Sequence, residues 1–205
     1  MKQLLLTSLL VFLALPLWAQ EEGETATPAP AASATRGRVQ RLENWNVGIS
    51  LVQWSEELRL RQFGVTTNSI ANLSGFIISV QKDYTYVRWG WSMGAHIGAG
   101  KANGGSPGFY EQNKIAFTML GASARAFYRL SGRINFGTTL MIFNRVLEWP
   151  DDTTTNVTAE SGKNPNVMAM GDLNLRLAKD WELYQGLGHV GEGGTLWRIG
   201  LNYRF

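Results

Sequence analysis

Side chains that alternate between apolar and polar at every second residue run through most of the chain after residue 42. From Val87 to Gly100 every odd position is apolar (Val, Trp, Trp, Met, Ala, Ile, Ala), whereas the even positions hold Arg, Ser, His and four Gly. Successive side chains of a β-strand point to opposite faces, so this segment predicts a strand with one apolar face and one polar face. A helix would not produce this period.

The same period predicts eight strands. We expect them near residues 44–54, 70–81, 87–99, 114–129, 133–146, 166–178, 181–188 and 197–205. Short, turn-like connections (81–86, 130–132, 179–180) alternate with longer polar ones (55–69, 101–113, 147–165, 188–194). Membrane barrels place short turns on one side and long loops on the other. The expected fold class is therefore all-β: an eight-stranded antiparallel up-and-down transmembrane β-barrel.

A soluble eight-stranded barrel of the lipocalin kind, with the apolar face turned inward, is the main alternative fold. Its outer surface would consist of Gly, Ser and Asn with scattered Arg, which is unusual for a solvated surface. The aromatic residues of the apolar face also gather at the strand ends that would share one rim: Trp45, Trp89, Phe136 and Trp181 at starts, and Tyr128, Tyr203 and Phe205 at finishes. An aromatic girdle at a membrane interface explains this sorting, so the membrane barrel is favoured.

The last strand carries the most specific signal. Its odd positions are Trp197, Ile199, Leu201, Tyr203 and the terminal Phe205. This segment resembles the closing strand of bacterial outer-membrane β-barrels, and the resemblance implies that these five residues form the signal read by the barrel-assembly machinery during insertion.

Over residues 42–205 the pattern is similar to the small barrels typified by the OmpA transmembrane domain and OmpX. Unlike OmpA, the chain shows no periplasmic domain after the eighth strand. The resemblance implies a structural or surface-interaction role, in envelope integrity or loop-mediated binding, with outer-membrane lipid and lipopolysaccharide as partners and an unknown extracellular ligand. The loops at 101–113 and 147–165, with Phe109, Tyr110 and Trp149, are the candidate contact surfaces.

The amino-terminal segment predicts the compartment. Lys2, the apolar run from Leu4 to Trp18 and the small residue Ala19 have the layout of a cleaved secretory signal peptide at 1–19. Residues 20–41 are rich in Pro and Ala and predict a disordered linker, which leaves 42–205 as the barrel. We therefore expect the protein in the bacterial outer membrane.

Other function classes find little support. The weak net charge and the lack of a basic stripe argue against nucleic acid as a partner. We expect no metal, no cofactor and no catalytic residue. A lipid A acyltransferase or deacylase remains the enzymatic alternative, because His96 shares the inward face with Ser92 and His189 lies near Glu192. A satisfied interior His96 and a solvent-exposed His189 are the favoured interpretation.

The inward face of an eight-stranded barrel has room only for side chains, so its charges need partners. We expect an interior plugged by polar side chains and held by an ionic network of Arg88, Arg125, Asp172, Arg176, Glu182, Arg198 and Arg204. Glu182 should reach Arg176, and a three-residue turn at 130–132 would place Gly137 opposite Arg125. The excess of Arg over acid leaves a narrow anion-friendly pore as the alternative to the plugged barrel.

Overall fold

The computed structural model describes residues 41–104, 114–153, 156–161, 165–191 and 194–205. The predicted signal peptide and all but the last residue of the predicted linker lie outside the described residues, as do Phe109, Tyr110 and Glu192. No helix in the described ranges is long and apolar enough to cross a membrane.

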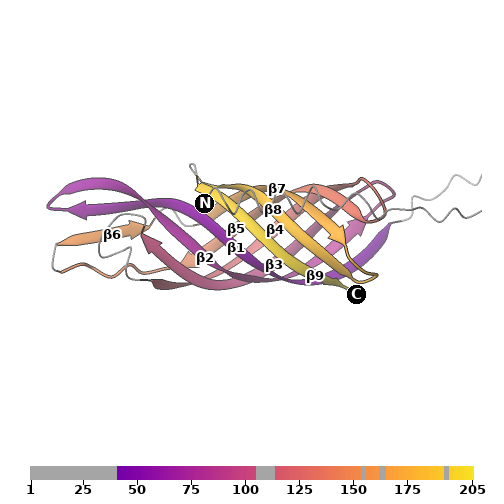
Figure 1. Ribbon diagram of the computed structural model, residues 1–205, viewed down its shortest axis with the longest axis horizontal. Coiled ribbons are helices and arrows are strands. Elements are labelled where there is room, and N and C mark those ends of the chain that lie inside the picture. The colour runs from indigo at the N-terminus through magenta and orange to yellow at the C-terminus, as the bar shows by residue number, and fades with distance from the viewer. Residues whose placement is uncertain (1–40, 105–113, 154–155, 162–164, 192–193) are drawn as a thin grey trace, which may run out of the picture. The chain divides into compact units, whose positions relative to one another are not determined.

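Eight strands form a closed antiparallel ring (Figure 1). The strands of the described residues are β1 (Leu42–Gln62), β2 (Val65–Thr85), β3 (Trp89–Gly104), β4 (Ile115–Arg129), β5 (Ile134–Val146), β6 (Val157–Ser161), β7 (Asn166–Arg176), β8 (Trp181–Val190) and β9 (Gly194–Arg204). The ring runs β1-β2-β3-β4-β5-β7-β8-β9, and β9 pairs back to β1. The expected fold class is therefore confirmed.

The seam between the first and last strands closes the ring. β9 pairs with β1 from Asn46 opposite Arg204 to Trp54 opposite Leu196. Beyond β9, Phe205 and Trp45 exchange two backbone hydrogen bonds, of 3.1 and 2.9 Å. Closure leaves no strand edge open at this seam, which a sheet in lipid requires because water cannot satisfy free backbone groups there.

A long hairpin replaces the first expected loop. Residues 55–69 were expected to be a polar loop, but β1 and β2 stay paired as far as Gln62 opposite Val65. Phe63 and Gly64 form the tip with φ of 47° and 82°. A two-residue turn with positive φ at both positions fits the right-handed twist of the strands that it joins. Such a turn therefore allows β1 and β2 to stay paired up to the tip.

The short strand β6 supports this hairpin from within the expected loop 147–165. β6 pairs with β1 from Leu58 opposite Ser161 to Gln62 opposite Val157. Leu58 is completely buried beneath the pairing. The additional strand thus gives the projecting part of β1 a second hydrogen-bonded neighbour and an apolar contact.

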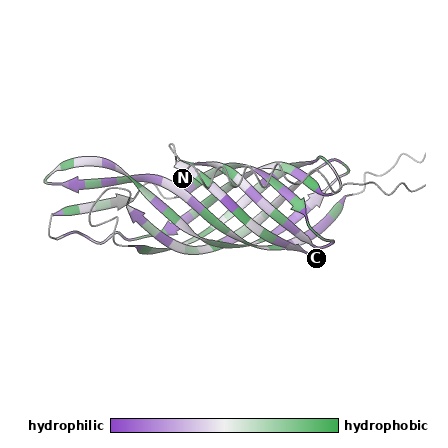
Figure 2. Cartoon of the chain, viewed as in Figure 1, coloured by the Kyte–Doolittle hydropathy of each residue, from purple (hydrophilic) through white to green (hydrophobic). Residues whose placement is uncertain are grey.

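The apolar face of every strand in the ring points outward. Figure 2 shows hydrophobic and hydrophilic residues alternating along the strands. Ile49 and Leu120, for example, are 56% and 64% exposed. The outward set includes Trp45, Val47, Ile49, Leu51, Phe76, Ile78, Val80, Trp89, Met93, Ile97, Leu120, Tyr128, Phe136, Leu140, Ile142, Val167, Trp181, Leu187, Leu201 and Tyr203. The lipocalin-like alternative requires these side chains inside and is therefore wrong.

The interior has two layers of different chemistry. A polar layer fills the end of the barrel that holds the short turns, and its members are Asn46, Ser79, Asp83, Ser92, Arg125, Thr139, Asp172, Asn174, Glu182 and Arg204. An apolar plug fills the other half with Val52, Trp54, Leu58, Leu73, Ile77, Phe117, Met119, Met141, Phe143, Met168, Met170, Val190 and Leu196. The expected plug of polar side chains thus describes only one half of the interior.

Candidate functional site

A buried ion pair joins β4 to β7 in the polar layer. The Nε of Arg125 donates to Oδ1 of Asp172 at 2.6 Å, and Nη2 lies 2.5 Å from the same oxygen. The hydroxyl of Thr139, on β5 between these strands, donates to Oδ2 at 2.6 Å. Because both charged side chains are almost fully buried, each depends on the other for compensation.

A second cluster surrounds the carboxylate of Glu182 on β8. Arg204 donates from Nη2 to Oε1. The expected partner Arg176 has its Nη2 at 3.6 Å from the same oxygen, and Nδ2 of Asn174 donates to Oε2 at 3.4 Å. Glu182 is 3% exposed and faces the interior. Strands β7, β8 and β9 are therefore tied together through one carboxylate.

Arg198 is buried without a carboxylate partner among the described residues. Its Nε donates to the Ser50 hydroxyl at 2.7 Å, and its guanidinium lies 4.9 Å from the centre of the Tyr184 ring. The ring face supplies negative electrostatic potential to the cation. Arg198 therefore belongs to the boundary between the two layers and not to the carboxylate-paired set.

Two expected placements are corrected. Arg88 is exposed in the turn that follows β2 and does not face the interior. Gly137 lies opposite Phe127, and Arg125 lies opposite Thr139. The register differs by two residues because the three-residue turn lies one position later, at 131–133, where the Leu130 N–H donates to the Ile134 carbonyl. The Ser131 hydroxyl accepts hydrogen bonds from the two backbone N–H groups that follow Gly132.

Asp83 and Glu56 are buried acids that lie outside the expected network. Asp83, at the end of β2, accepts a 2.5 Å hydrogen bond from Nδ2 of Asn46. Glu56, on the long hairpin, pairs with Arg145, and Nε1 of Trp54 donates to it at 3.3 Å. Both acids fall in segments that the sequence predicted as connections. The inward parity of even positions in β1, extended past residue 54, would have placed Glu56 inside.

The two histidines lie in unlike environments. His96 is 3% exposed on the inward face, and neither ring nitrogen has a hydrogen-bond partner among the described residues. Ser92 is also buried on this face, four residues away along β3. His189 points outward at the far end of β8, and its Nδ1 lies 3.1 Å from the Gly194 carbonyl. The described residues bring neither histidine together with a serine and a carboxylate in hydrogen-bonding contact.

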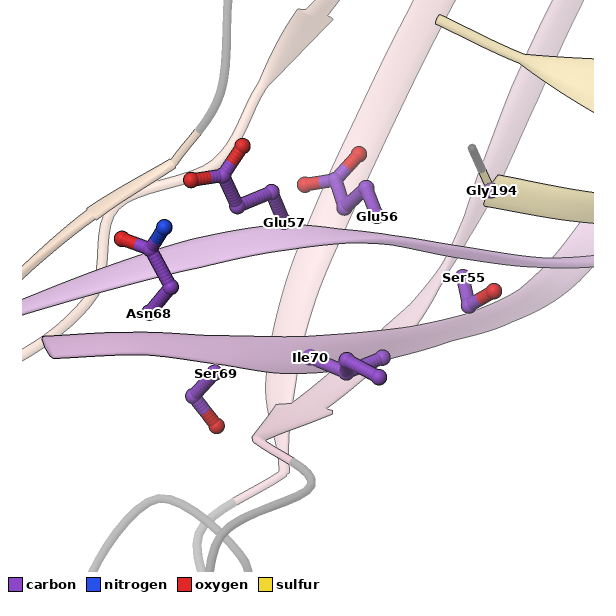
Figure 3. Close-up of a pocket in the computed structure, with 7 residues that line it drawn as sticks. All are labelled: Ser55, Glu56, Glu57, Asn68, Ser69, Ile70 and Gly194. Atoms are coloured by element: carbon purple, nitrogen blue, oxygen red, sulfur yellow. The ribbon is translucent and has the colours of Figure 1, made fainter. Parts of the chain in front are cut away.

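The end of the barrel opposite the short turns carries a groove where the long hairpin leaves the ring. Figure 3 shows Glu57 of β1 and Asn68 of β2 beside this groove, which is lined by Ser55, Glu56, Glu57, Asn68, Ser69, Ile70 and Gly194. Trp149, expected to be a contact residue, is partly buried and packs against the apolar plug. No group of three or more His, Asp or Glu residues gathers to hold a metal ion in the described part of the chain.

The opposite rim combines aromatic rings with basic groups. Lys82 lies 5.7 Å from the centre of the Trp45 ring and 5.2 Å from that of Tyr84. Its Nζ is 2.9 Å from Oε2 of Glu43, and this contact lowers the pKa of the Glu43 carboxyl. Tyr203 stacks on Phe205 beside these residues. The aromatic sorting expected from the sequence is therefore present at one rim.

The closed ring with an outward apolar face defines the chain as a small eight-stranded β-barrel. No protein-family model matches the sequence, and no curated protein matches it. Among solved structures, the chain is similar to Ail of Yersinia pestis in complex with the heparin analogue sucrose octasulfate (13% identity, TM-score 0.45, 78% of this chain and 99% of that chain covered).

Two further solved structures show the same likeness. Neisserial surface protein A shares 10% identity at a TM-score of 0.45, covering 78% of this chain and 97% of that chain. The outer membrane protein OprG of Pseudomonas aeruginosa shares 9% at 0.48, covering 79% and 95%.

Proposed function

We propose that the protein is an integral outer-membrane barrel with a structural and surface-interaction role. The observation that carries the proposal is the outward apolar face on every strand of the ring, bounded at one end by aromatic rings. Exposed apolar patches larger than about 600 Å² are rare on soluble monomers, and this face surrounds the barrel. A bilayer is the environment in which such a face is stable.

The strand connections suggest the orientation. One rim holds the start of β1, the end of β9 and the short turns near 86–88, 130–133 and 177–180. The other rim holds the long hairpin and the longer connections. In outer-membrane barrels the short turns face the periplasm and the long connections face outward. The hairpin therefore projects from the cell and carries the exposed side chains of Phe63, Val65 and Ile70.

Single cysteines test both location and orientation, because the chain has none of its own. Thr67→Cys lies on the projecting hairpin and should react with a membrane-impermeant maleimide on intact cells. Gly132→Cys is the matched control, since it lies in an exposed short turn where an added Cβ contacts nothing. It should react only after the outer membrane is permeabilised, and equal labelling of both in intact cells would refute the proposal.

A plugged barrel is favoured over the anion-friendly pore because the plug is apolar. Trp54, Phe143 and Met168 are at most 1% exposed inside the outer half. An ion that entered this layer would lose its hydration shell and find no polar groups to replace it. The purified chain should produce no discrete conductance steps in a planar bilayer, and regular steps would establish the pore instead.

The lipid-modifying enzyme is the weaker candidate because its two histidines are separated. His96 lies inside the barrel and His189 outside it, so the two cannot share a catalytic centre. Lipid A from a deletion strain should match that of the wild type by mass spectrometry. A difference that is lost with His96→Ala or His189→Ala would establish the enzyme.

A further inference from the structure

Basic side chains gather on the rim that holds the short turns. Its cations are Arg41, Lys82, Arg88, Arg129, Arg133 and Lys179, and its acids are Glu43 and Asp180. Every short turn contributes at least one of these cations at the turn or at the strand end beside it. We call these six cations the basic rim. In the sequence of the longer connections (55–69, 101–113, 147–165 and 188–194), in contrast, acidic residues outnumber basic ones.

Backbone hydrogen bonds fix cations of neighbouring strands beside one another. The Arg129 N–H donates to the Arg88 carbonyl at 2.8 Å, which links the β2–β3 turn to the end of β4. In the same way, the Arg176 N–H donates to the Arg133 carbonyl at 2.7 Å. These adjacent positions are therefore part of the hydrogen-bonded rim and not of a freely moving loop.

Most of the basic rim lacks an acidic partner. Within the described ranges no carboxylate forms an ion pair with Arg88, Arg129, Arg133 or Lys179. Glu43 pairs only with the other two cations of the rim, Arg41 and Lys82. Like charges held next to one another repel, so an external anion at this rim would relieve the repulsion.

The height of the basic rim indicates which anion. Arg88 is adjacent in sequence to Trp89, Arg129 is adjacent to Tyr128, and Lys179 lies two residues before Trp181. Trp and Tyr of barrel girdles mark the level of the lipid headgroups. The guanidinium and ammonium groups beside them are therefore at the level of the lipid phosphates, for which Arg provides paired N–H donors.

We propose that the basic rim binds the headgroups of anionic phospholipids in the inner leaflet of the membrane. This proposal rests on the proposed outer-membrane location, with the short turns facing the periplasm. Arg88, Arg133 and Lys179 form its centre, because all three are exposed and carry a charge without a partner among the described residues. Bound lipid compensates the charge of the rim and fixes the height of the barrel in the bilayer.

Tryptophan quenching by brominated lipids measures this selectivity in the full chain. The protein is reconstituted into phosphatidylethanolamine vesicles containing either brominated phosphatidylglycerol or brominated phosphatidylethanolamine, and the girdle tryptophans report which lipid is adjacent. The wild type should favour phosphatidylglycerol. A basic residue near an anionic surface changes partitioning by about fivefold, so removing three should reduce the preference on the order of tenfold or more.

The variant is Arg88→Gln with Arg133→Gln and Lys179→Gln, all exposed positions on the basic rim. The matched control removes the same charge from the other end, with Arg59→Gln, Arg61→Gln and Lys101→Gln. The control should keep the wild-type preference. High salt, about 1 M, should weaken the preference in the wild type because it shortens the Debye length to about 3 Å.

Three results would overturn the proposal: no preference in the wild type, an unchanged preference in the rim variant, or an equal loss in the control. If the rim variant no longer sediments with isolated peptidoglycan but keeps the wild-type lipid preference, the basic rim binds that polymer instead. The cysteine labelling of Thr67→Cys and Gly132→Cys is independent of lipid composition. If the labelling shows the opposite orientation, the proposed function fails while the measured lipid preference stands.

Discussion

Replacing Leu140 by arginine separates a membrane barrel from a water-soluble one. Leu140 lies on the outward face of β5 and is 51% exposed. In water, an exposed leucine at such a site could become arginine with a change in the free energy of unfolding of only about 0.5 kcal/mol in either direction. In a bilayer the same substitution places a guanidinium among acyl chains.

The register gives the depth of Leu140 and thus the expected penalty. Leu140 follows the girdle residue Phe136 by four positions along β5. A rise of about 3.4 Å per residue along a strand tilted by about 40° puts it about 10 Å from the girdle. The apolar band of such barrels is about 25 Å tall, so this depth is close to the midplane, where arginine costs about 2–4 kcal/mol.

The free energy of unfolding is measured by urea titration of the chain in phospholipid vesicles, followed by the fluorescence of the seven tryptophans in residues 42–205. Leu140→Arg should lower it by about 2–4 kcal/mol. Thr67→Arg, exposed on the hairpin beyond the ring, is the control and should change it by less than about 0.5 kcal/mol. Equal, small effects of both substitutions would refute the claim that the outward face of β5 contacts lipid.

Three further substitutions test the interior and the closing strand. Asp172→Ala should lower the free energy of unfolding by about 3–5 kcal/mol because it leaves buried Arg125 uncompensated, whereas the double variant Arg125→Met with Asp172→Leu should recover most of the loss in the same titration. Gly121→Ala should cost about 1–3 kcal/mol because the new Cβ meets the backbone of β5, whereas Gly132→Ala, in open space, should be close to neutral. Deletion of Phe205 should reduce the amount of assembled barrel in cells, measured by its heat-dependent gel mobility, and unchanged assembly would show that the terminal aromatic is not part of the insertion signal.

The ring itself was predictable from the sequence because period-two alternation is a local property. Whether the odd or the even positions of a strand are apolar decides which of its faces points outward. Residues 87–99 and 133–146 are examples. Closure next to Trp45 was predictable as well, since eight strands of alternating direction bring the last beside the first. Phe205 lies there, held by two backbone hydrogen bonds.

The hairpin and the apolar plug were not predictable in the same way, and both failures have one cause. Alternation identifies a strand only where its two faces meet different environments. Beyond residue 54 the outward face of β1 becomes polar, with Glu57 and Arg59, while the inward face becomes apolar at Leu58. The contrast between faces reverses there, so the pattern of alternation predicts a loop in place of a strand. At Met168 and Met170 of β7 the inward face is apolar while the outward face keeps Val167, so the contrast between faces is lost there and the apolar plug is not visible in the alternation.

The apolar plug separates the buried charges at the two ends of the barrel. A continuous polar interior would connect the ends electrostatically and through water, but the buried layer around Trp54 and Phe143 interrupts that connection. Charge compensation must then be achieved independently on each side. Glu56 and Arg145 pair with each other on the side of the long hairpin, whereas the polar layer and the basic rim lie on the side of the short turns. The unpaired cations at Arg88, Arg133 and Lys179 therefore cannot draw on acids at the far end, and under the proposed lipid binding the headgroups supply the negative charge.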